Sequence, residues 1–170
     1  MLSVSKTKLD GVLLIKPASM FHDFRGSYVE TYNEEQYKAA GINVNFIQDD
    51  ISVSRKNVLR GIHGDDVTWK LVSCHYGKIY LVVVNWNKAS PQFGEWVSFE
   101  LSDENHLQVL IPPNFGNGHV VLSDMAVFHY KQSTYYDRAR QFTIMWNDPK
   151  LHIRWPVSNP ILSKRDSGKG

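Results

Sequence analysis

The chain has little cysteine, no long apolar run and almost no excess charge, and each shortage excludes a class of protein. Its 170 residues contain one cysteine, Cys74, so no internal disulfide can form, which is typical of cytoplasmic proteins. The longest apolar runs, such as residues 81–84, are too short to span a bilayer, and residues 1–10 have no apolar core of signal-peptide length. A net charge of +2 gives no indication of nucleic-acid binding. We therefore expect a cytoplasmic protein that binds neither membranes nor nucleic acids.

Motifs of metal, nucleotide-cofactor and nucleophile chemistry are also missing. The seven histidines form no H-x-H pair and no H-E-x-x-H motif, although ligands scattered along the chain leave a metal site open. There is no glycine-rich phosphate loop and no serine in a nucleophile elbow. Cys74 is interpreted as a small buried apolar residue rather than as a nucleophile.

Helix signals are scarce, whereas strand signals are frequent. Asn33 can cap a helix, Gln36 completes the spacing of a capping box, and Gly41 can end the helix after Ala40. Short apolar segments separated by Gly, Pro, Asn and Asp predict an all-β sandwich or barrel, in one domain of residues 1–170, without parallel crossovers. The predicted strands are residues 11–15, 26–32, 44–54, 58–63, 69–74, 78–86, 96–101, 108–111, 118–122, 126–130 and 142–146.

Cationic side chains gather in one of these strands and at the start of the next. Arg60 and His63 would lie on opposite faces under strict alternation, but Gly61 between them permits a bulge that turns both inward. Lys70 follows after a turn that contains two aspartates. Two interpretations are open for His63: a structural strand histidine, or a group that takes part in chemistry.

Tyr130 raises a similar question in the predicted strand 126–130. Alternation places Ala126, Phe128 and Tyr130 on one face, which we expect to point inward. Tyr130 is then either a core residue whose hydroxyl is satisfied by a hydrogen bond, or a proton donor facing a cavity.

Several motifs in their order along the chain resemble the sugar-nucleotide 3,5-epimerase family, of the dTDP-4-dehydrorhamnose 3,5-epimerase type. The resemblance covers nearly the whole chain. It rests on "DFRGSYVE" (23–30), "QDDISVSRKNVLRGIH" (48–63), "KLV" (70–72), "SPQFGEW" (90–96), "LSDEN" (101–105), "IPPNFGNGH" (111–119), "WNDP" (146–149), "IRWP" (153–156) and "LSKRD" (162–166).

This resemblance implies a cupin-type jelly roll with one or two short helices, which forms a homodimer and needs neither metal nor cofactor. The implied substrate is a nucleotide-linked 4-keto-6-deoxy sugar, whose ketone acidifies the C–H bonds at C3 and C5. A base removes one proton and an acid returns a proton to the opposite face, so the configuration inverts. Three alternatives stay open: a 3,4-ketoisomerase of the same fold, a non-catalytic sugar-nucleotide-binding jelly roll, and a metal-dependent cupin enzyme.

The resemblance also implies roles for four catalytic residues. His63 is expected to be the base, and Asp166 in "LSKRD" is expected to orient it and stabilise its protonated form. Tyr130 is expected to be the acid on the far side of the sugar ring. Lys70 occupies the position of a cation near the sugar ketone, where negative charge develops.

Further residues are expected to bind the substrate. Arg25 and Arg60 resemble clamps on the pyrophosphate, because a planar guanidinium suits two oxygens. Glu30 and Gln48 resemble contacts to the nucleotide or the sugar, and Arg165 is placed among the substrate contacts. In this family the segment with Arg25 and Glu30 often reaches the partner subunit, so the resemblance implies shared active sites.

Some positions depart from the family pattern. Asn117 replaces a second histidine, and His119 lies two residues further along the same strand. Gly64-Asp65 replaces an aromatic-glutamine pair, Asp50 replaces an asparagine, and Gln141 replaces a glutamate. We still expect Asp50, Asn117, His119 and Gln141 to contact substrate. The motifs resemble a branch acting on bacterial capsule and lipopolysaccharide sugars. Three points therefore stay open: the nucleotide (dTDP, GDP or CDP), the sugar (hexose or heptose) and whether C3 alone or both carbons are inverted.

Overall fold

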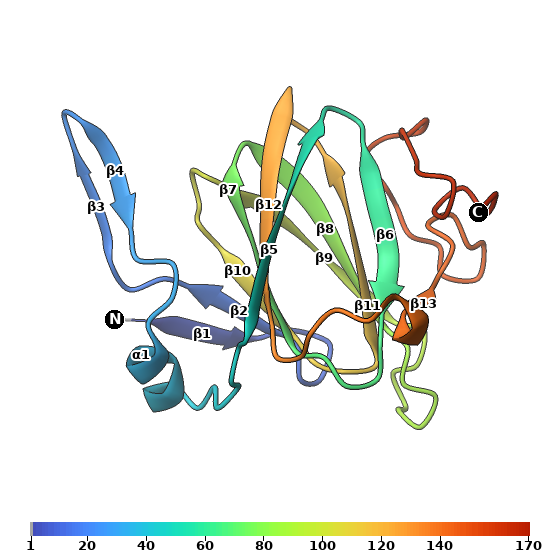
Figure 1. The fold of residues 1–170 in the computed structure, drawn as a ribbon, viewed down its shortest axis with the longest axis horizontal. Helices are drawn as coiled ribbons and strands as arrows, with labels where there is room; N and C mark the ends of the chain where they lie inside the picture. The colour runs from blue at the N-terminus through green and yellow to red at the C-terminus, as the bar shows by residue number, and fades with distance from the viewer. Residues whose placement is uncertain (1) are drawn as a thin grey trace.

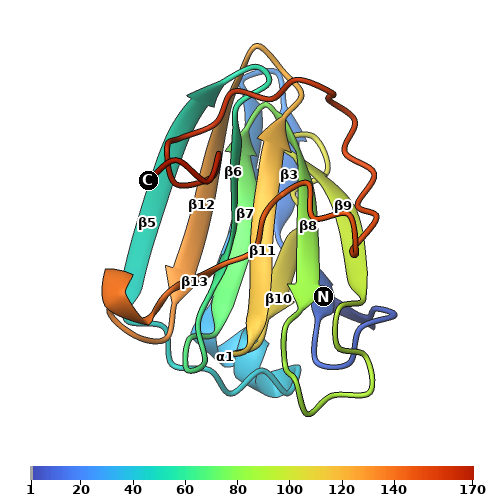
Figure 2. The ribbon, with the colours of Figure 1, turned by 90° about the vertical axis from the view of Figure 1, so that its right-hand side faces the viewer.

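Two β-sheets face each other and form a sandwich in the computed structural model, which describes residues 2–170 (Figures 1 and 2). One sheet has six strands in the order β1 (Ser3–Lys6), β2 (Leu13–Lys16), β10 (Gln108–Ile111), β7 (Lys70–Tyr76), β12 (Met125–Gln132) and β5 (Gln48–Arg55). The other has five, in the order β13 (Phe142–Thr143), β6 (Leu59–Gly64), β11 (Phe115–Val121), β8 (Lys78–Asn85) and β9 (Trp96–Ser102). All strand pairs in these sheets are antiparallel.

The predicted all-β sandwich is confirmed, and each predicted strand segment overlaps an observed strand. Two strands were missed, β1 and β3 (Met20–Asp23), because their sequences SVSK and MFHD have no apolar alternation. Four segments were predicted too long by two or more residues: residues 11–12, 30–32, 44–47 and 144–146 lie outside the strands. Val44 and Phe46 were read as strand residues because they are apolar, but they pack in a satellite cluster around Tyr37 of the helix.

The core lies between the sheets and continues behind the five-stranded sheet. The run Leu81–Val84 in β8 is fully buried, as its continuous apolar sequence predicts. Leu81 and Val83 join the core between the sheets, whereas Val82 and Val84 pack against Ile144 and Leu151 on the outer side. Cys74 is also in the core, where burial raises the pKa of its thiol to about 11. This fits the prediction of an inert buried residue.

The predicted helix is present as α1 (Glu34–Ala39), with Asn33 as its N-cap. The Asn33 side chain accepts a hydrogen bond from the Gln36 backbone N–H at 3.2 Å. The second half of the capping box is absent, because the Gln36 amide instead donates to the carboxylate of Glu30 at 3.1 Å. The other helix is the single 3₁₀ turn η1 (Arg138–Arg140), and within residues 2–170 no helix is long and apolar enough to cross a membrane.

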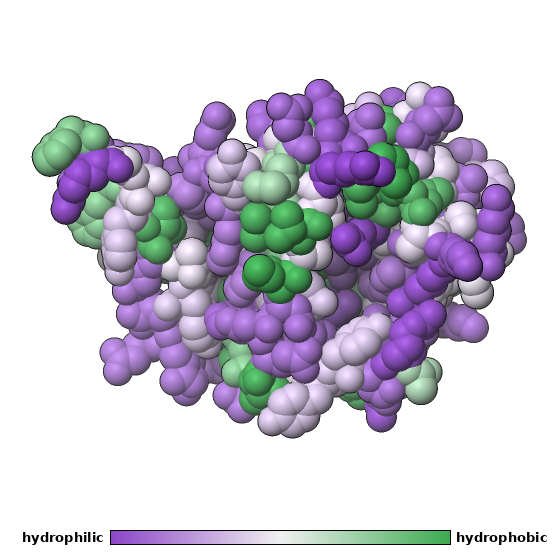
Figure 3. Space-filling view, turned by 45° about the horizontal axis from the view of Figure 1, so that its top comes forward, coloured by the Kyte–Doolittle hydropathy of each residue, from purple (hydrophilic) through white to green (hydrophobic). Residues whose placement is uncertain are grey.

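A hairpin formed by β3 and β4 (Gly26–Val29) extends away from the sandwich (Figure 1). We call residues 20–29 the arm. Its apolar side chains are exposed: Phe24 is 98% accessible, and Phe21 and Tyr28 are each 65% accessible. Figure 3 shows apolar atoms at the end of this projection, next to strongly hydrophilic ones. Exposed aromatic rings on a projecting hairpin indicate a surface that contacts another molecule.

Candidate active site

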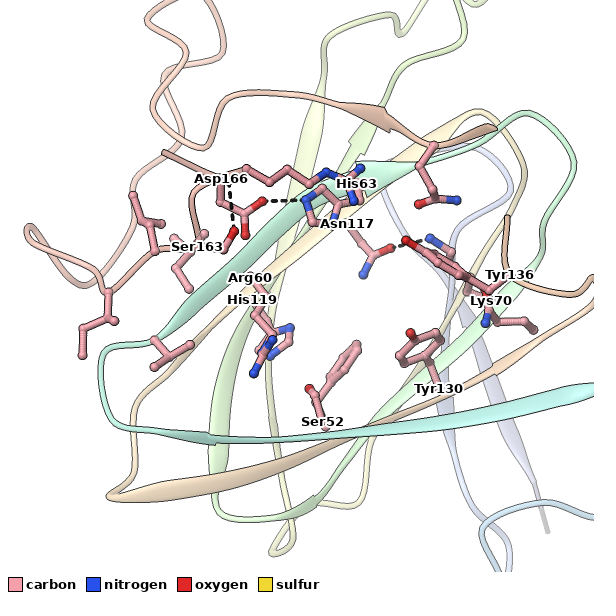
Figure 4. A pocket seen from close by; sticks show the side chains of 18 residues that line it. Ser52, Arg60, His63, Lys70, Asn117, His119, Tyr130, Tyr136, Ser163 and Asp166 are labelled. Atoms are coloured by element: carbon pink, nitrogen blue, oxygen red, sulfur yellow. Dashed lines mark hydrogen bonds and ion pairs between the residues drawn. The ribbon is translucent and has the colours of Figure 1, made fainter. Parts of the chain in front are cut away.

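A cavity of about 500 Å³ lies between the two sheets and is closed on one side by the C-terminal segment (Figure 4). The five-stranded sheet contributes residues of β6 and β11, and the six-stranded sheet contributes residues of β5, β7 and β12. The lining is Ser52, Val58, Leu59, Arg60, His63, Lys70, Asn117, His119, Phe128, Tyr130, Gln132, Tyr136, Gln141, Ile161, Leu162, Ser163, Arg165 and Asp166.

Gly61 allows Arg60 and His63 to face this cavity together. On the neighbouring strand β11, His119 pairs with Arg60 and Asn117 pairs with His63, so β6 has one additional residue at this point. Gly61 has a φ of +113°, and a Cβ there would lie 2.6 Å from the carbonyl oxygen of Asn117. Only glycine fits this close approach. The predicted irregularity at Gly61 is therefore confirmed, and both side chains line the cavity.

His63 is held by a buried carboxylate from the C-terminal segment. Its Nε2 lies 2.6 Å from Oδ1 of Asp166, and the Asp166 side chain is 4% exposed. Burial raises the pKa of Asp166, but hydrogen bonds from His63, Ser163 and the Gly61 backbone outweigh it and hold the pKa below its usual value. An ionised carboxylate at this distance fixes the orientation of the His63 ring.

Tyr130 faces the cavity from the opposite sheet. Its neighbours Ala126 and Phe128 on β12 are buried, so the predicted inward face is confirmed. Figure 4 shows Tyr130 rising from one wall while His63 lies at the other. Burial, with smaller contributions from Asp50 and Tyr136, raises the pKa of Tyr130 to about 12. The phenol is therefore protonated at neutral pH and can donate its proton into the cavity.

Lys70 is a buried residue that lines the cavity. It is 8% exposed and takes part in none of the ion pairs formed within residues 2–170. Its Nζ donates to Oδ1 of Asn117 at 3.4 Å. Burial lowers the pKa of Lys70, and the charge of Asp65 opposes this. A desolvated ammonium without a carboxylate in contact attracts a negative charge that develops on a ligand.

His119 lies beside Arg60 rather than beside His63. Its ring stacks on Phe128, with 4.2 Å between the ring centroids. Burial, together with the charge of Arg60, lowers the pKa of His119 to about 3. His119 is therefore neutral at physiological pH, and Asn117 is the group that lies opposite His63.

The cavity brings together most of the predicted site residues, but not all of them. Arg60, Asn117, Gln141 and Arg165 line it together with the four predicted catalytic residues. Four predicted residues do not line the cavity. Arg25 lies in the arm and Glu30 directly follows it. Gln48 and Asp50 lie on β5, where Gln48 donates to Asp50 and Asp50 is linked to the cavity-lining Gln132. Arg25 pairs with Asp23, and Asp50 accepts a hydrogen bond from Gln132 at 2.7 Å. Substrate contacts for these outer residues stay predictions.

Sequence reasoning missed four polar residues of the cavity. Ser52 and Gln132 could have been found by alternation, since each lies two residues from an inward position of its strand. Tyr136 follows β12 in a loop, and Ser163 lies in the irregular C-terminal segment, where no periodicity applies. Within residues 2–170, no three His, Cys, Asp or Glu side chains are grouped so that they can hold a metal ion.

Comparison with known proteins gives consistent matches over nearly the whole chain. A family model described as dTDP-4-dehydrorhamnose 3,5-epimerase matches residues 6–169. A dTDP-4-dehydrorhamnose 3,5-epimerase from Salmonella typhimurium is 42% identical over 98% of this chain and 93% of its own length.

Solved structures agree with these matches. The dTDP-6-deoxy-D-glucose-3,5-epimerase from Legionella pneumophila, in complex with dTDP-4-keto-L-rhamnose, has a TM-score of 0.93 at 38% identity, covering 99% of this chain and 91% of that one. A 3'-monoepimerase from Streptomyces bikiniensis in complex with dTDP-quinovose has a TM-score of 0.89 at 29% identity, covering 95% and 84%.

Proposed function

This chain belongs to the dTDP-4-dehydrorhamnose 3,5-epimerase family, and from that premise we propose that it inverts C3, or C3 and C5, of a nucleotide-linked 4-keto-6-deoxy sugar. The family consists of isomerases that act on carbohydrates. The observation that carries the proposal is the placement of His63 and Tyr130 on facing walls of one cavity, with Lys70 between the sheets.

In the proposed reaction, His63 removes the proton next to the ketone. The pair with Asp166 at 2.6 Å stabilises the imidazolium, and the electron pair moves to the ketone oxygen to give an enolate. The Lys70 ammonium stabilises this oxygen. Tyr130 then protonates the same carbon from the opposite face, which inverts the centre. Solvent returns the proton to Tyr130 and takes one from His63, so no cofactor is consumed.

Uptake of deuterium tests the proposed function. We expect that incubating dTDP-, GDP- and CDP-linked 4-keto-6-deoxy sugars in D₂O puts label at each carbon that is inverted, because the returned proton comes from solvent. Mass spectrometry counts the labels, and NMR of the product separates inversion from a shift of the carbonyl to C3. Binding of these nucleotides without label at either carbon contradicts the proposal and favours a binding protein.

The nucleotide and the number of inverted centres belong to the same proposal. The dTDP-linked sugar is the first choice, since the Legionella and Streptomyces bikiniensis structures contain dTDP-sugars. Both 3,5-epimerases and a 3'-monoepimerase occur among the relatives, so inversion at C3 is common to them. Two arginines, Arg60 and Arg165, line the cavity and suit the pyrophosphate. We also propose a location in the cytoplasm.

A homodimer with shared active sites is also proposed. Strand β5 is an edge strand of the six-stranded sheet and exposes Ile51 and Val53, which are 64% and 55% accessible. Met125 on the adjacent strand adds to this apolar surface, and the face in Figure 3 has strongly hydrophobic side chains near its middle. An apolar edge strand needs a cover, and a second copy that also receives the arm supplies one. Arg25 would then reach the partner's cavity.

Mixing two inactive variants tests the sharing of sites. We expect Arg25→Ala and His63→Asn each to lose activity alone, and their mixture, unfolded and refolded together, to regain about a quarter of the wild-type activity, because half of the dimers are mixed and have one intact site of two. Deuterium uptake at a limiting substrate concentration measures the activity that the mixture regains. Refolding each variant by itself is the control. A monomer in sedimentation equilibrium, or a mixture without activity, contradicts the shared site.

A further inference from the structure

Asp65 lies two residues after the proposed base and is held by three hydrogen bonds behind the cavity wall. Its Oδ1 accepts from the backbone N–H groups of Val67 at 3.0 Å and Thr68 at 2.7 Å. Its Oδ2 accepts from Nε2 of Gln141 at 2.7 Å. Asp65 is 5% exposed and does not itself line the cavity, whereas Gln141 does. One buried carboxylate thus fixes both the turn that leads to Lys70 and an amide of the cavity wall.

Asp65 also affects the protonation of Lys70. A buried ammonium without compensation tends to lose its proton. Asp65 is the anionic group that favours the charged form, and Arg165 opposes it. A carboxylate in contact with Nζ would cancel the attraction that Lys70 exerts on a ligand. A carboxylate that lies beyond ion-pair contact favours protonation and leaves the ammonium available, since its hydrogen-bond partner is the neutral Asn117.

We propose that Asp65 is a positioning residue of the epimerisation, which fixes the Gln141 amide from behind and maintains the positive charge of Lys70. The inference rests on the proposed function, since the charge of Lys70 acts on the enolate. By the family resemblance, position 65 is expected to be glutamine and position 141 glutamate, so this chain has the donor and the acceptor exchanged. The cavity wall therefore presents a neutral amide at position 141, and its negative charge lies behind the wall at position 65.

The exchanged donor and acceptor at positions 65 and 141 suggest a double-mutant cycle, which separates the effect of the negative charge from the effect of the hydrogen bond between the two side chains. In Asp65→Asn the side-chain oxygen can keep both backbone hydrogen bonds, but its NH2 group then faces the NH2 group of Gln141, so the Gln141 amide has to turn over to accept a hydrogen bond. In Gln141→Glu two carboxylates meet at the 2.7 Å contact. The double variant D65N/Q141E restores donor to acceptor and returns one negative charge to the pair. Asp66→Asn, at the exposed neighbour that pairs with Arg140, is the matched control.

The measurement is the pH profile of deuterium uptake into a dTDP-linked 4-keto-6-deoxyhexose. Activity that needs protonated Lys70 is lost as pH rises through its pKa. Removing the negative charge of Asp65 lowers the pKa of Lys70. We therefore expect D65N to shift the alkaline limb of the pH profile downward by about one pH unit and, at pH values above this limb, to lower kcat about tenfold. D65N/Q141E is expected to return the limb toward the wild-type position, and D66N to leave it unchanged.

A titration that is independent of activity accompanies the profile. NMR of ¹³C-labelled lysine, with the Lys70 signal assigned by Lys70→Gln, follows the protonation of Lys70 directly in each folded variant. A downward shift in D65N that the double variant reverses supports the inference. The same Lys70 titration in D65N and wild type overturns it. Absence of label with the wild-type protein instead contradicts the proposed function, and the titration still decides the role of Asp65.

Discussion

Substitution of His63 by asparagine is expected to lower both inversion and deuterium uptake by roughly 10²–10⁴-fold, the range typical for loss of a general base. Asparagine has no basic nitrogen, and its side chain is too short to replace the contact of Nε2 with Asp166, so both the base and its pairing with the buried carboxylate are removed. Because proton removal precedes every later step, uptake and inversion fall together. Both are measured in one experiment in D₂O, by mass spectrometry and by NMR of the sugar.

The same substitution at another histidine is the control for this result. His152 does not line the cavity between the sheets and has a φ of +51°, which asparagine tolerates well. H152N should keep the wild-type rates. Thermal unfolding of H63N establishes that the fold is intact. A folded H63N that retains more than about a tenth of the wild-type uptake is incompatible with His63 as the base.

Tyr130→Phe is expected to separate the two half-reactions. The phenylalanine ring fills the same space but has no proton to donate, so inversion should fall by roughly 10²–10⁴-fold. His63 is unaffected and can still remove a proton and return one to the same face. Recovered substrate should therefore gain deuterium without a change in configuration, which NMR of the unreacted sugar detects.

A neighbouring tyrosine is the control for the loss of a hydroxyl. Tyr135 is 76% exposed and does not line the cavity, so Y135F should have wild-type rates of inversion and uptake. If Y130F inverts the sugar at the wild-type rate, another group is the acid. Tyr136, which also lines the cavity, would then be the next residue to replace.

Sequence patterns predicted those parts of the site that follow from strand geometry. The alternation in residues 126–130 placed Tyr130 on the inward face, and Gly61 predicted the irregularity that turns Arg60 and His63 to one side. These are local effects, determined by residues within a few positions of each other.

The remaining parts depend on contacts between distant segments, which no local pattern contains. Asp166 reaches His63 across 103 positions of sequence, from a segment without regular structure. Only the resemblance of "LSKRD" to a family motif suggested it. The contact between Lys70 and Asn117 depends on how the two sheets face each other. The hydrogen bond of Asp65 with Gln141 depends in turn on the placement of the turn η1.

The position of Asp166 has a consequence for when this protein becomes active. Most of the sandwich is complete by residue 143, including the strands that hold His63 and Tyr130. The carboxylate that orients the imidazole arrives only with residues 157–170, which dock through the Val58–Ile161 bridge. A nascent polypeptide on the ribosome can therefore assemble its sheets before its base is competent. With His63 as the proposed base, turnover would begin only after residues 157–170 have left the exit tunnel and packed against the cavity.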